Sequence, residues 1–344
     1  MHKHRNSVDA TVNILVTGAA GFIGSKVSQS LVKLGHRIIA VDNFNNYYSS
    51  ALKRARVESL LKPLGVDVIN HDICERESIL DLIATKQPEI VLHFAAQAGI
   101  RLPNEQVSKY VDSNLVGFSN ILLATIQSEI PNFMYASSSS VYGESLNFPY
   151  SEKDLTLRPI SFYGATKLAN EILTPTLVKN SATKARGLRF FTVYGPWGRP
   201  DMAYFRLINA ALNKKQFHLF GDGTIVRDFT YVDDVVNSIL QLMEDLMTRA
   251  KGFHDVVNIA GGKPASLKEM ISEISVQLNE EISIRTSEMH NNDVPVTSAD
   301  TTYLRSLIPH IPTTSLRFGL AEVINWGRQP NFNILLEDWV QSSI

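Results

Sequence analysis

The stretch of sequence that decides the fold is Val12-Asn13-Ile14-Leu15-Val16-Thr17-Gly18-Ala19-Ala20-Gly21-Phe22-Ile23-Gly24. Residues 12–17 form an apolar run typical of a buried strand, and three glycines follow it with the spacing G-x-x-G-x-x-G. Such glycines allow a tight turn, a close approach of the backbone to a pyrophosphate, and close packing of helix on strand. The helix that begins here offers unpaired N–H groups and its positive dipole end to phosphates. We therefore expect a dinucleotide-binding loop formed by Gly18, Gly21, Phe22, Ile23 and Gly24.

An acidic residue at the end of the next predicted strand indicates which dinucleotide binds. Asp42 follows the run 38–41 and lies 24 residues after Gly18. A carboxylate at this place accepts hydrogen bonds from ribose hydroxyls and repels a 2′-phosphate, which favours NAD over NADP. The alternative is a glycine-rich structural turn with Asp42 as a cap. Segments after the third and fourth strands complete the expected cofactor site, which comprises Asp42, Asn43, Asp72, Ile73, Phe94, Ala95 and Ala96.

The first half of the chain alternates short β-branched runs with amphipathic stretches. The strand-like runs are residues 12–17, 38–41, 66–69, 90–93 and 133–136. Helical stretches such as 22–34 and 75–85 lie between them. This alternation predicts an α/β fold, a Rossmann-type doubly wound parallel sheet with helices on both faces. Because right-handed crossovers bring the carboxyl ends of the strands to one side, we expect ligands to bind there.

After about residue 186 the alternation loosens, which indicates a second, discontinuous domain. Residues 188–191 are typical of one more central strand, and residues 204–213, 266–278 and 316–326 of amphipathic helices. We expect an NAD-binding domain at residues 12–186, rejoined by about 222–260, and a smaller substrate-binding domain at 187–221 and 261–330. Residues 1–11 are expected to be a flexible tail, and residues 331–344 a C-terminal helical extension.

The composition restricts the class of protein. The 344 residues are 44% apolar, which is enough to bury a substantial core. Lys and Arg number 33 against 34 Asp and Glu, without a basic block, so we expect neither nucleic acid nor a membrane as partner. The lone cysteine, Cys74, excludes an internal disulfide and a cysteine-built zinc site, and we expect no metal. No apolar run reaches the ~18 residues of a membrane helix, and the start of the chain lacks a signal core, so we expect a cytoplasmic location.

Tyr163 and Lys167 have the i, i+4 spacing that places two side chains on one face of a helix. A lysine ammonium near a phenol lowers the phenol's pKa, so the tyrosine can take a proton from a hydroxyl while hydride leaves the same carbon. An accidental pair on a solvated helix is the alternative. The serine run 137–140 follows a predicted strand, and Ser138 lies 25 residues before Tyr163. We therefore expect a catalytic relay of Ser138, Tyr163 and Lys167.

The most distinctive segment is residues 187–203, Gly-Leu-Arg-Phe-Phe-Thr-Val-Tyr-Gly-Pro-Trp-Gly-Arg-Pro-Asp-Met-Ala. With residues 95–101, 110–118 and 227–234, it resembles the extended short-chain dehydrogenase/reductases of the nucleotide-sugar epimerase group, most nearly the UDP-glucuronate 4-epimerases. The resemblance covers about residues 12–326. It implies a retained NAD, which Tyr163 and Lys167 also contact, and C4 epimerisation of UDP-glucuronate to UDP-galacturonate through a transient 4-keto sugar. It also implies a homodimer formed through helices near residues 104–128 and 162–180.

The same resemblance implies residues that bind the substrate. Arg227 would clamp the diphosphate, Asp293 would meet the uridine ribose, and Ser138 would bond the reacting oxygen. An arginine pairs with a carboxylate through two charge-assisted hydrogen bonds, although Arg199 in its proline-rich turn could instead anchor the loop. The candidates to contact the carboxylate of a glucuronate are Thr192, Arg199, Ser139, Ser140 and, second to these, Arg101.

Three alternatives to a UDP-glucuronate 4-epimerase remain open from the sequence. The first is an epimerase for neutral UDP-sugars such as glucose or N-acetylglucosamine. The second is a nucleotide-sugar dehydratase or decarboxylase. Relatives with those activities carry an acidic residue where Ser138-Ser139-Ser140 stands here, and elimination of water needs an acid and a base that this run lacks. The third is a non-catalytic NAD-sensing protein, which the presence of both Tyr163 and Lys167 disfavours.

Overall fold

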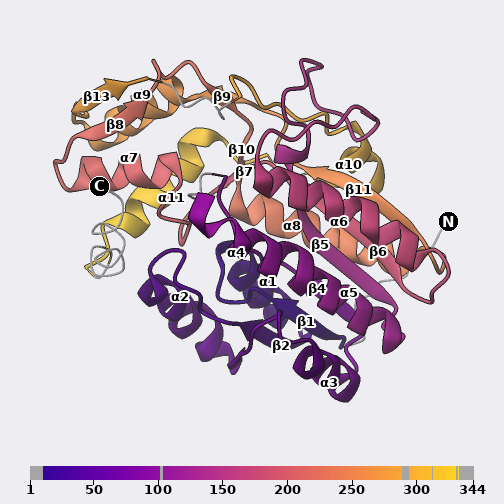
Figure 1. Ribbon diagram of the computed structural model, residues 1–344. Coiled ribbons are helices and arrows are strands. Elements are labelled where there is room, and N and C mark those ends of the chain that lie inside the picture. The colour runs from indigo at the N-terminus through magenta and orange to yellow at the C-terminus, as the bar shows by residue number, and fades with distance from the viewer. Residues whose placement is uncertain (1–10, 101–103, 289–293, 312, 331, 333–344) are drawn as a thin grey trace, which may run out of the picture.

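The computed structural model describes residues 11–100, 104–288, 294–311, 313–330 and 332. At its centre is a seven-stranded parallel sheet with the order β11-β6-β5-β4-β1-β2-β3 (Figure 1). The strands are β1 (Asn13–Thr17), β2 (Arg37–Asp42), β3 (Val68–Asn70), β4 (Ile90–His93), β5 (Asn132–Ser138), β6 (Lys184–Phe190) and β11 (His254–Ile259). The chain first builds outward from β1 to β3 and then from β4 to β11. The order therefore reverses between β1 and β4, where doubly wound sheets bind ligands.

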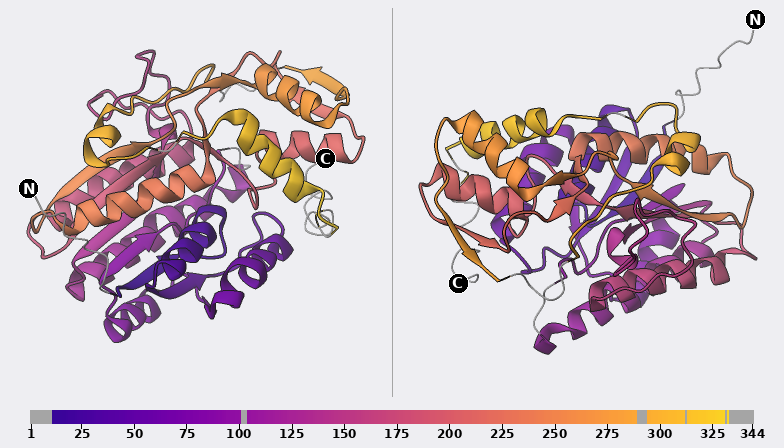
Figure 2. Two further views of the ribbon diagram at one scale, coloured as in Figure 1. Left: turned by 180° about the vertical axis from the view of Figure 1, so that it is seen from behind. Right: turned by 90° about the horizontal axis from the view of Figure 1, so that it is seen from above.

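Helices cover both faces of this sheet (Figures 1 and 2). One face carries α3 (Arg76–Lys86), α5 (Phe118–Gln127) and α6 (Phe162–Val178), and the other carries α1 (Phe22–Lys33) and α8 (Val232–Met247). Strand β1 supplies both apolar cores, because Leu15 packs with the α3–α5 side while Ile14 and Val16 pack with the α1–α8 side. A strand buried on both faces needs a continuous apolar run, which β1 has. The predicted Rossmann-type α/β fold is confirmed.

A second part of the chain lies against the carboxyl ends of these strands, around α7, α9 and α11 in Figure 1. It has its own apolar core, in which Tyr204 and Ile208 pack with Met270 and Trp326. Its short strands pair as β10 with β7, β12 with β9 and β13 with β8. Its elements are β7 (Thr192–Tyr194), α7 (Ala203–Leu212), β8 (Phe217–Phe220), β9 (Val226–Arg227), β10 (Phe229–Tyr231), β12 (Ala265–Ser266), α9 (Leu267–Leu278), β13 (Ile284–Ser287) and α11 (Leu316–Gly327).

Short helices connect these elements. They are α2 (Ser50–Arg56), η1 (Val57–Leu61), η2 (Lys62–Leu64), η3 (Asn104–Gln106), α4 (Ser108–Tyr110), η4 (Val111–Gly117), η5 (Ser139–Val141) and α10 (Thr302–Leu307). Within the described ranges, no helix has both the length and the apolar character needed to cross a membrane. Residues 1–10 of the predicted tail, and 331 and 333–344 of the predicted C-terminal extension, lie outside the described residues. Phe332 is described, and its ring packs against Phe205 and Trp326.

Candidate active site

A cavity of about 890 Å³ lies between the carboxyl ends of the strands and the second part of the chain. Residues predicted for the cofactor and residues predicted for the substrate meet in it. Those that line it are Gly18, Gly21, Phe22, Ile23, Gly24, Asp42, Asn43, Ile73, Phe94, Ala95, Ala96, Ser138, Ser139, Ser140, Tyr163, Lys167, Thr192, Arg199 and Arg227. Asp72 is not part of the lining. Arg101 and Asp293, both predicted to bind substrate, lie outside the described residues.

The glycine loop has the shape and the donors that a dinucleotide requires. A Cβ at Gly18 would lie 2.7 Å from the Ala95 nitrogen, and one at Gly24 would lie 2.1 Å from the Gly18 oxygen. Gly18 also has a φ of +70°, which other residues rarely adopt. Helix α1 begins after Gly21 without a side-chain cap and without an acidic residue in its first turn. Its unpaired N–H groups therefore remain available at the cavity wall for a pyrophosphate.

The two acidic residues predicted near the cofactor have different positions. Asp42 lines the cavity at the end of β2, and its carboxylate accepts hydrogen bonds from the backbone N–H groups of Ala20 at 3.0 Å and Phe44 at 2.8 Å. This fixes the carboxylate beside the glycine loop. Asp72 instead accepts a hydrogen bond from Asn43 Nδ2 at 2.9 Å. It therefore stands behind Asn43 and orients an amide that does line the cavity.

Helix α6 brings Tyr163 and Lys167 to the cavity wall. Ser161 caps the helix by accepting a hydrogen bond at 3.0 Å from a backbone N–H of the first turn, so the helix begins just before Tyr163. One turn later, Lys167 is 2% exposed and donates from Nζ to the carbonyl oxygen of Ala136 at 2.9 Å. Its Nζ lies 5.8 Å from the centre of the Tyr163 ring. The two side chains thus share one helix face, as their spacing predicted.

The serine run places hydroxyl groups on the same wall. Ser138 ends β5, the strand on which α6 packs. Its hydroxyl accepts a hydrogen bond from Ser140 N and donates one to Ser140 Oγ, both at 3.1 Å, which starts the short helix η5. Thr192 begins β7 and also lines the cavity. The wall around the reacting group therefore carries hydroxyls from two segments that lie far apart in the sequence.

Burial and nearby charges act in opposite directions on the pKa values of Tyr163 and Lys167. Burial raises the pKa of the Tyr163 phenol, whereas Arg199 and a hydrogen bond to Ser138 lower it, and the net direction is upward. Burial lowers the pKa of Lys167 to about 8, although Glu171 opposes this change. The upward direction for Tyr163 differs from the sequence expectation, in which Lys167 and the charge of an oxidised nicotinamide lower its pKa, because burial removes water from the phenol. Ionising Tyr163 therefore requires further positive charge in the cavity.

Arg199 is held by an acidic residue of its own loop. Its Nε and Nη2 donate to Asp201 at 3.0 and 2.5 Å, and the Tyr47 hydroxyl donates to the same carboxylate at 3.2 Å. The guanidinium lies over the Tyr47 ring, 5.9 Å from its centre. Arg199 thus anchors its proline-rich turn, and it also lines the cavity, where its charge lowers the pKa of Tyr163.

A second arginine joins the glycine loop to this same turn. Arg56 of α2 is 0% exposed, and its guanidinium donates to the carbonyl oxygens of Ala20 at 3.1 Å, Trp197 at 2.9 Å and Gly198 at 2.9 Å. It also donates to the Tyr48 hydroxyl at 2.6 Å. The backbone of the glycine loop and the backbone of the turn that carries Arg199 are therefore fixed relative to each other.

Several residues that hold the site in place were not predicted from the sequence. Asn114 accepts a hydrogen bond from Gln97 N at 2.8 Å and donates to Thr166 Oγ1 at 3.1 Å, which ties the loop after β4 to α6. No spacing signals Asn114 or Tyr47, because their partners lie far along the chain. Asp201 could have been found, since an acidic residue two positions after Arg199 is an obvious partner for it.

The fold and the cavity define a class of protein, a Rossmann-type enzyme with a Tyr–Lys pair beside a dinucleotide loop. The family model described as the NAD dependent epimerase/dehydratase family matches residues 14–260. The chain belongs to this family. NAD is therefore its cofactor, as the glycine loop and Asp42 predicted, and the cavity lining described above fits it.

Similar proteins are known over nearly the whole chain. Protein CapI of Staphylococcus aureus is 38% identical over 331 residues, which are 92% of this chain and 98% of that protein. UDP-glucuronate 4-epimerase 4 of Arabidopsis thaliana is 38% identical over 335 residues, 94% of this chain and 76% of that protein. A solved structure of UDP-glucuronic acid 4-epimerase from Bacillus cereus, in complex with UDP-glucuronic acid and NAD, has a TM-score of 0.84 at 34% identity and matches 91% of this chain and 98% of its own. The resemblance expected from the motifs is confirmed.

Proposed function

We propose that this protein is a UDP-glucuronate 4-epimerase, which interconverts UDP-glucuronate and UDP-galacturonate with a retained NAD. The observation that carries the proposal is the meeting of Tyr163, Lys167 and Ser138 in the cavity of the glycine loop, with Arg199 beside Tyr163. The named relatives support the choice of substrate. The free thiol of Cys74 fits a reducing compartment, and we place the enzyme in the cytoplasm.

The proposed reaction inverts the sugar at C4 by oxidising and then reducing that carbon. Bound NAD supplies the reversible two-electron acceptor and, in its oxidised form, positive charge in the cavity. Tyr163 takes the proton of the 4-hydroxyl as C4 is oxidised, and it returns the proton when the keto group is reduced on its opposite face. Lys167 stabilises the phenolate between these steps, and Ser138 donates a hydrogen bond to the reacting oxygen. No net redox change results, which fits a retained cofactor.

The sugar turns over between the two half-reactions. Binding energy should therefore lie at the UDP end, where Arg227 suits a bidentate contact with the diphosphate and Asp293 would meet the ribose. A 4-keto glucuronate is a β-keto acid and can lose carbon dioxide. Hydroxyls such as those of Thr192 and Ser139, together with Arg199, stabilise the charged carboxylate. This stabilisation opposes the loss of carbon dioxide from the keto sugar.

Two measurements on the purified protein test this proposal. Denaturation should release stoichiometric NAD, because the cofactor is retained through each turnover. UDP-glucuronate should equilibrate with UDP-galacturonate without added cofactor, which separation of the two products measures. A protein that releases no nucleotide, or that needs added NAD and accumulates an oxidised sugar, contradicts an epimerase.

An epimerase for neutral UDP-sugars is the second candidate. The observation that favours it is the contact of Arg199 with Asp201, because a guanidinium that already has an acidic partner attracts a substrate carboxylate less strongly. Parallel assays with UDP-glucuronate and UDP-glucose distinguish the two candidates. Faster turnover of UDP-glucose at equal concentrations would favour the neutral sugar.

Replacing Arg199 by alanine tests whether this residue recognises a carboxylate. We expect kcat/KM to fall by about 10²-fold for UDP-glucuronate and by less than about tenfold for UDP-glucose, because only the acid loses a charge-assisted hydrogen bond. Arg199→Lys, assayed beside it, keeps the charge and removes the bidentate geometry. Equal losses on both sugars would remove Arg199 from carboxylate recognition and leave it as an anchor of its turn.

We further propose a homodimer formed through α6 and the neighbouring η4. These helices expose apolar side chains, including Val116 at 46%, Phe162 at 45% and Ile172 at 60% exposure. Ile172→Asp is expected to give monomers, because a charge would be buried without a partner between subunits. Light scattering after size-exclusion chromatography measures the mass. Val276→Asp on α9, where the side chain is 65% exposed, is the matched control and should leave the dimer intact. A dimer that persists in Ile172→Asp contradicts this interface.

A further inference from the structure

A buried polar cluster lies directly behind Lys167, and the proposed reaction does not use it. Glu171, one turn after Lys167 on α6, is 7% exposed, and Arg189 of β6 is 3% exposed. Arg189 donates to both carboxylate oxygens of Glu171, from Nε at 2.9 Å and from Nη2 at 2.8 Å. The Ser137 hydroxyl donates to the same carboxylate at 2.5 Å. Three charged or polar groups from α6, β5 and β6 are therefore joined out of contact with water.

This cluster continues to the edge of the sheet. Arg189 Nη1 donates to the Tyr142 hydroxyl at 2.9 Å, and that hydroxyl donates to Asn258 Oδ1 at 2.7 Å. Asn258 lies on β11, so side chains connect α6, which carries Tyr163, to β6 and β11, in addition to the backbone pairing of β5, β6 and β11. Ser137, which bonds Glu171, directly precedes Ser138. The position of the Ser138 hydroxyl thus depends on a strand end that Glu171 holds.

Lys167 needs a nearby negative charge because it is buried. Its Nζ is placed by the Ala136 carbonyl, and a neutral oxygen does not compensate a full positive charge. Burial lowers the pKa of Lys167 to about 8, and Glu171 is the group that opposes this change. A neutral Lys167 could not stabilise the Tyr163 phenolate. The charge of Glu171 therefore bears on the chemical step, although Glu171 does not line the cavity.

We propose that Glu171 is a positioning residue of the reaction, whose carboxylate, held by Arg189 and Ser137, keeps Lys167 protonated beside Tyr163 and fixes the Ser138 end of β5. This rests on the proposed function, because it assigns Glu171 a task in the oxidation of a substrate hydroxyl. Arg189 is a positioning residue as well, because its two hydrogen bonds fix the orientation of the Glu171 carboxylate. Neither residue touches substrate or cofactor.

The other titratable groups around this cluster keep one charge state near neutral pH. Burial, with Lys167 nearby, lowers the pKa of His93 to about 3, so its ring is neutral. The pair with Glu171 raises the pKa of Arg189, which remains a cation. Burial raises the pKa of Tyr142 to about 12 and that of Tyr135 above its usual range. Burial also lowers the pKa of His254, so its ring is neutral as well. Among these groups, Lys167 is therefore the one whose charge we expect to change between pH 6.5 and 8.5.

Kinetics of Glu171 variants across pH test the proposal. In Glu171→Gln, we expect the deficit in kcat relative to the unaltered protein to grow about sixfold from pH 6.5 to pH 8.5, because Lys167 loses its proton about one unit earlier. KM for the UDP-sugar should stay within about twofold, since the UDP end of the cavity is untouched. Glu171→Asp keeps the charge and should show no such growth. A deficit that is the same at every pH overturns the proposal.

A double variant keeps the test valid if the single variant folds poorly. Glu171→Gln leaves the Arg189 cation buried without a partner, whereas Glu171→Gln with Arg189→Met removes both charges, a replacement that buried ion pairs often tolerate. The double variant should fold and should retain the pH-dependent deficit, because Lys167 still lacks its counter-charge. A double variant with the pH profile of the unaltered protein also overturns the proposal.

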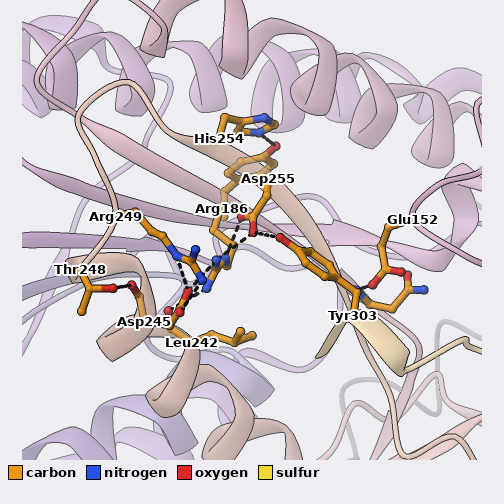
Figure 3. Close-up of polar contacts among 11 residues, drawn as sticks. Glu152, Arg186, Leu242, Asp245, Thr248, Arg249, His254, Asp255 and Tyr303 are labelled. Carbon is orange, nitrogen blue, oxygen red and sulfur yellow. Dashed lines mark hydrogen bonds and ion pairs between the residues drawn. The ribbon is translucent and has the colours of Figure 1, made fainter. Parts of the chain in front are cut away.

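A second buried ion pair on the same strand supplies the matched control (Figure 3). Arg186 of β6 is 0% exposed and donates to both oxygens of Asp255, at 2.7 and 2.8 Å, while Asp245 and Tyr303 complete the group. It lies on the other face of the sheet, toward α8, away from Lys167. Asp255→Asn should lower the melting temperature, and any deficit in kcat should be the same at every pH. If the deficit of Asp255→Asn also grows with pH, the effect of Glu171→Gln comes from lost packing and the proposal is overturned.

A direct titration of Lys167 needs no activity. The ¹³Cε resonance of Lys167, assigned by its absence in Lys167→Arg, is followed against pH in the NAD-containing protein. Glu171→Gln should shift its midpoint to lower pH by about one unit, and Asp255→Asn should not shift it. An unchanged midpoint in Glu171→Gln overturns the proposal. If the unaltered protein turns over no UDP-sugar, the proposed function fails, while this titration still decides the role of Glu171.

Discussion

Tyr163→Phe is expected to lower the turnover of UDP-glucuronate by about 10³-fold, the range over which a positioned acid–base group acts. Phenylalanine keeps the ring, which packs against the Tyr110 ring with centres 6.1 Å apart. It removes only the oxygen that takes the proton of the 4-hydroxyl. NAD content and the rise in melting temperature with UDP-glucuronate should therefore match those of the unaltered protein. Product formation over hours, measured by chromatography, quantifies the residual rate.

Tyr135→Phe is the control for this replacement. Tyr135 lies on β5 like Ser138, its hydroxyl is paired with His254 at 3.0 Å, and it does not line the cavity. Removing it costs a buried hydrogen bond of about 1 kcal/mol and should leave most of the activity. If Tyr163→Phe inverts C4 at the rate of the unaltered protein, another group moves the proton and the proposed mechanism is wrong.

Gly24→Ala is expected to remove most of the bound NAD. Its Cβ would lie 2.1 Å from the Gly18 oxygen and 2.9 Å from the Gly18 carbonyl carbon, and backbone atoms cannot move aside as a flexible side chain can. Helix α1 would have to move off β1, at a cost of ~1–3 kcal/mol for the overpacked contact. Because we propose that the N-terminus of α1 binds the pyrophosphate, we expect the NAD released on denaturation to fall at least about tenfold.

Gly35→Ala separates backbone strain from loss of the cofactor site. Gly35 has a φ of +89°, but a Cβ there would meet nothing within 4 Å. Its replacement should lower the melting temperature through strain alone, by about 1 kcal/mol of stability, and leave the NAD content unchanged. Full NAD content in Gly24→Ala would mean that the cofactor does not depend on close packing of helix on strand.

Local sequence patterns predicted the parts of the fold and site that depend on neighbours along the chain. The expected strand 12–17 and helix 22–34 are β1 and α1, within a residue at each end. The helices expected at 266–278 and 316–326 are α9 and α11. The proximity of Tyr163 and Lys167 could also be predicted, because helix spacing alone brings these side chains to one face.

The rest depends on contacts that local patterns do not encode. Tyr47 reaches Asp201 across 154 residues, and only the fold brings the two together. The upward direction of the Tyr163 pKa depends on burial, which the residue types around it do not reveal. Glu171 stands at i+4 from Lys167 and could have been noticed. Its partner Arg189 lies on strand β6, so the buried ion pair between the two residues could not have been predicted.

The four hydrogen bonds of Arg56 have a consequence for how the sugar turns over in the proposed reaction. Because one guanidinium binds both the glycine loop and the turn that carries Arg199, we expect these two walls of the cavity to keep a fixed relative position. We therefore expect the keto sugar to rotate within the cavity while its UDP portion stays bound and the surrounding backbone does not move. Loss of these hydrogen bonds is expected to disturb the glycine loop and the turn of Arg199 together.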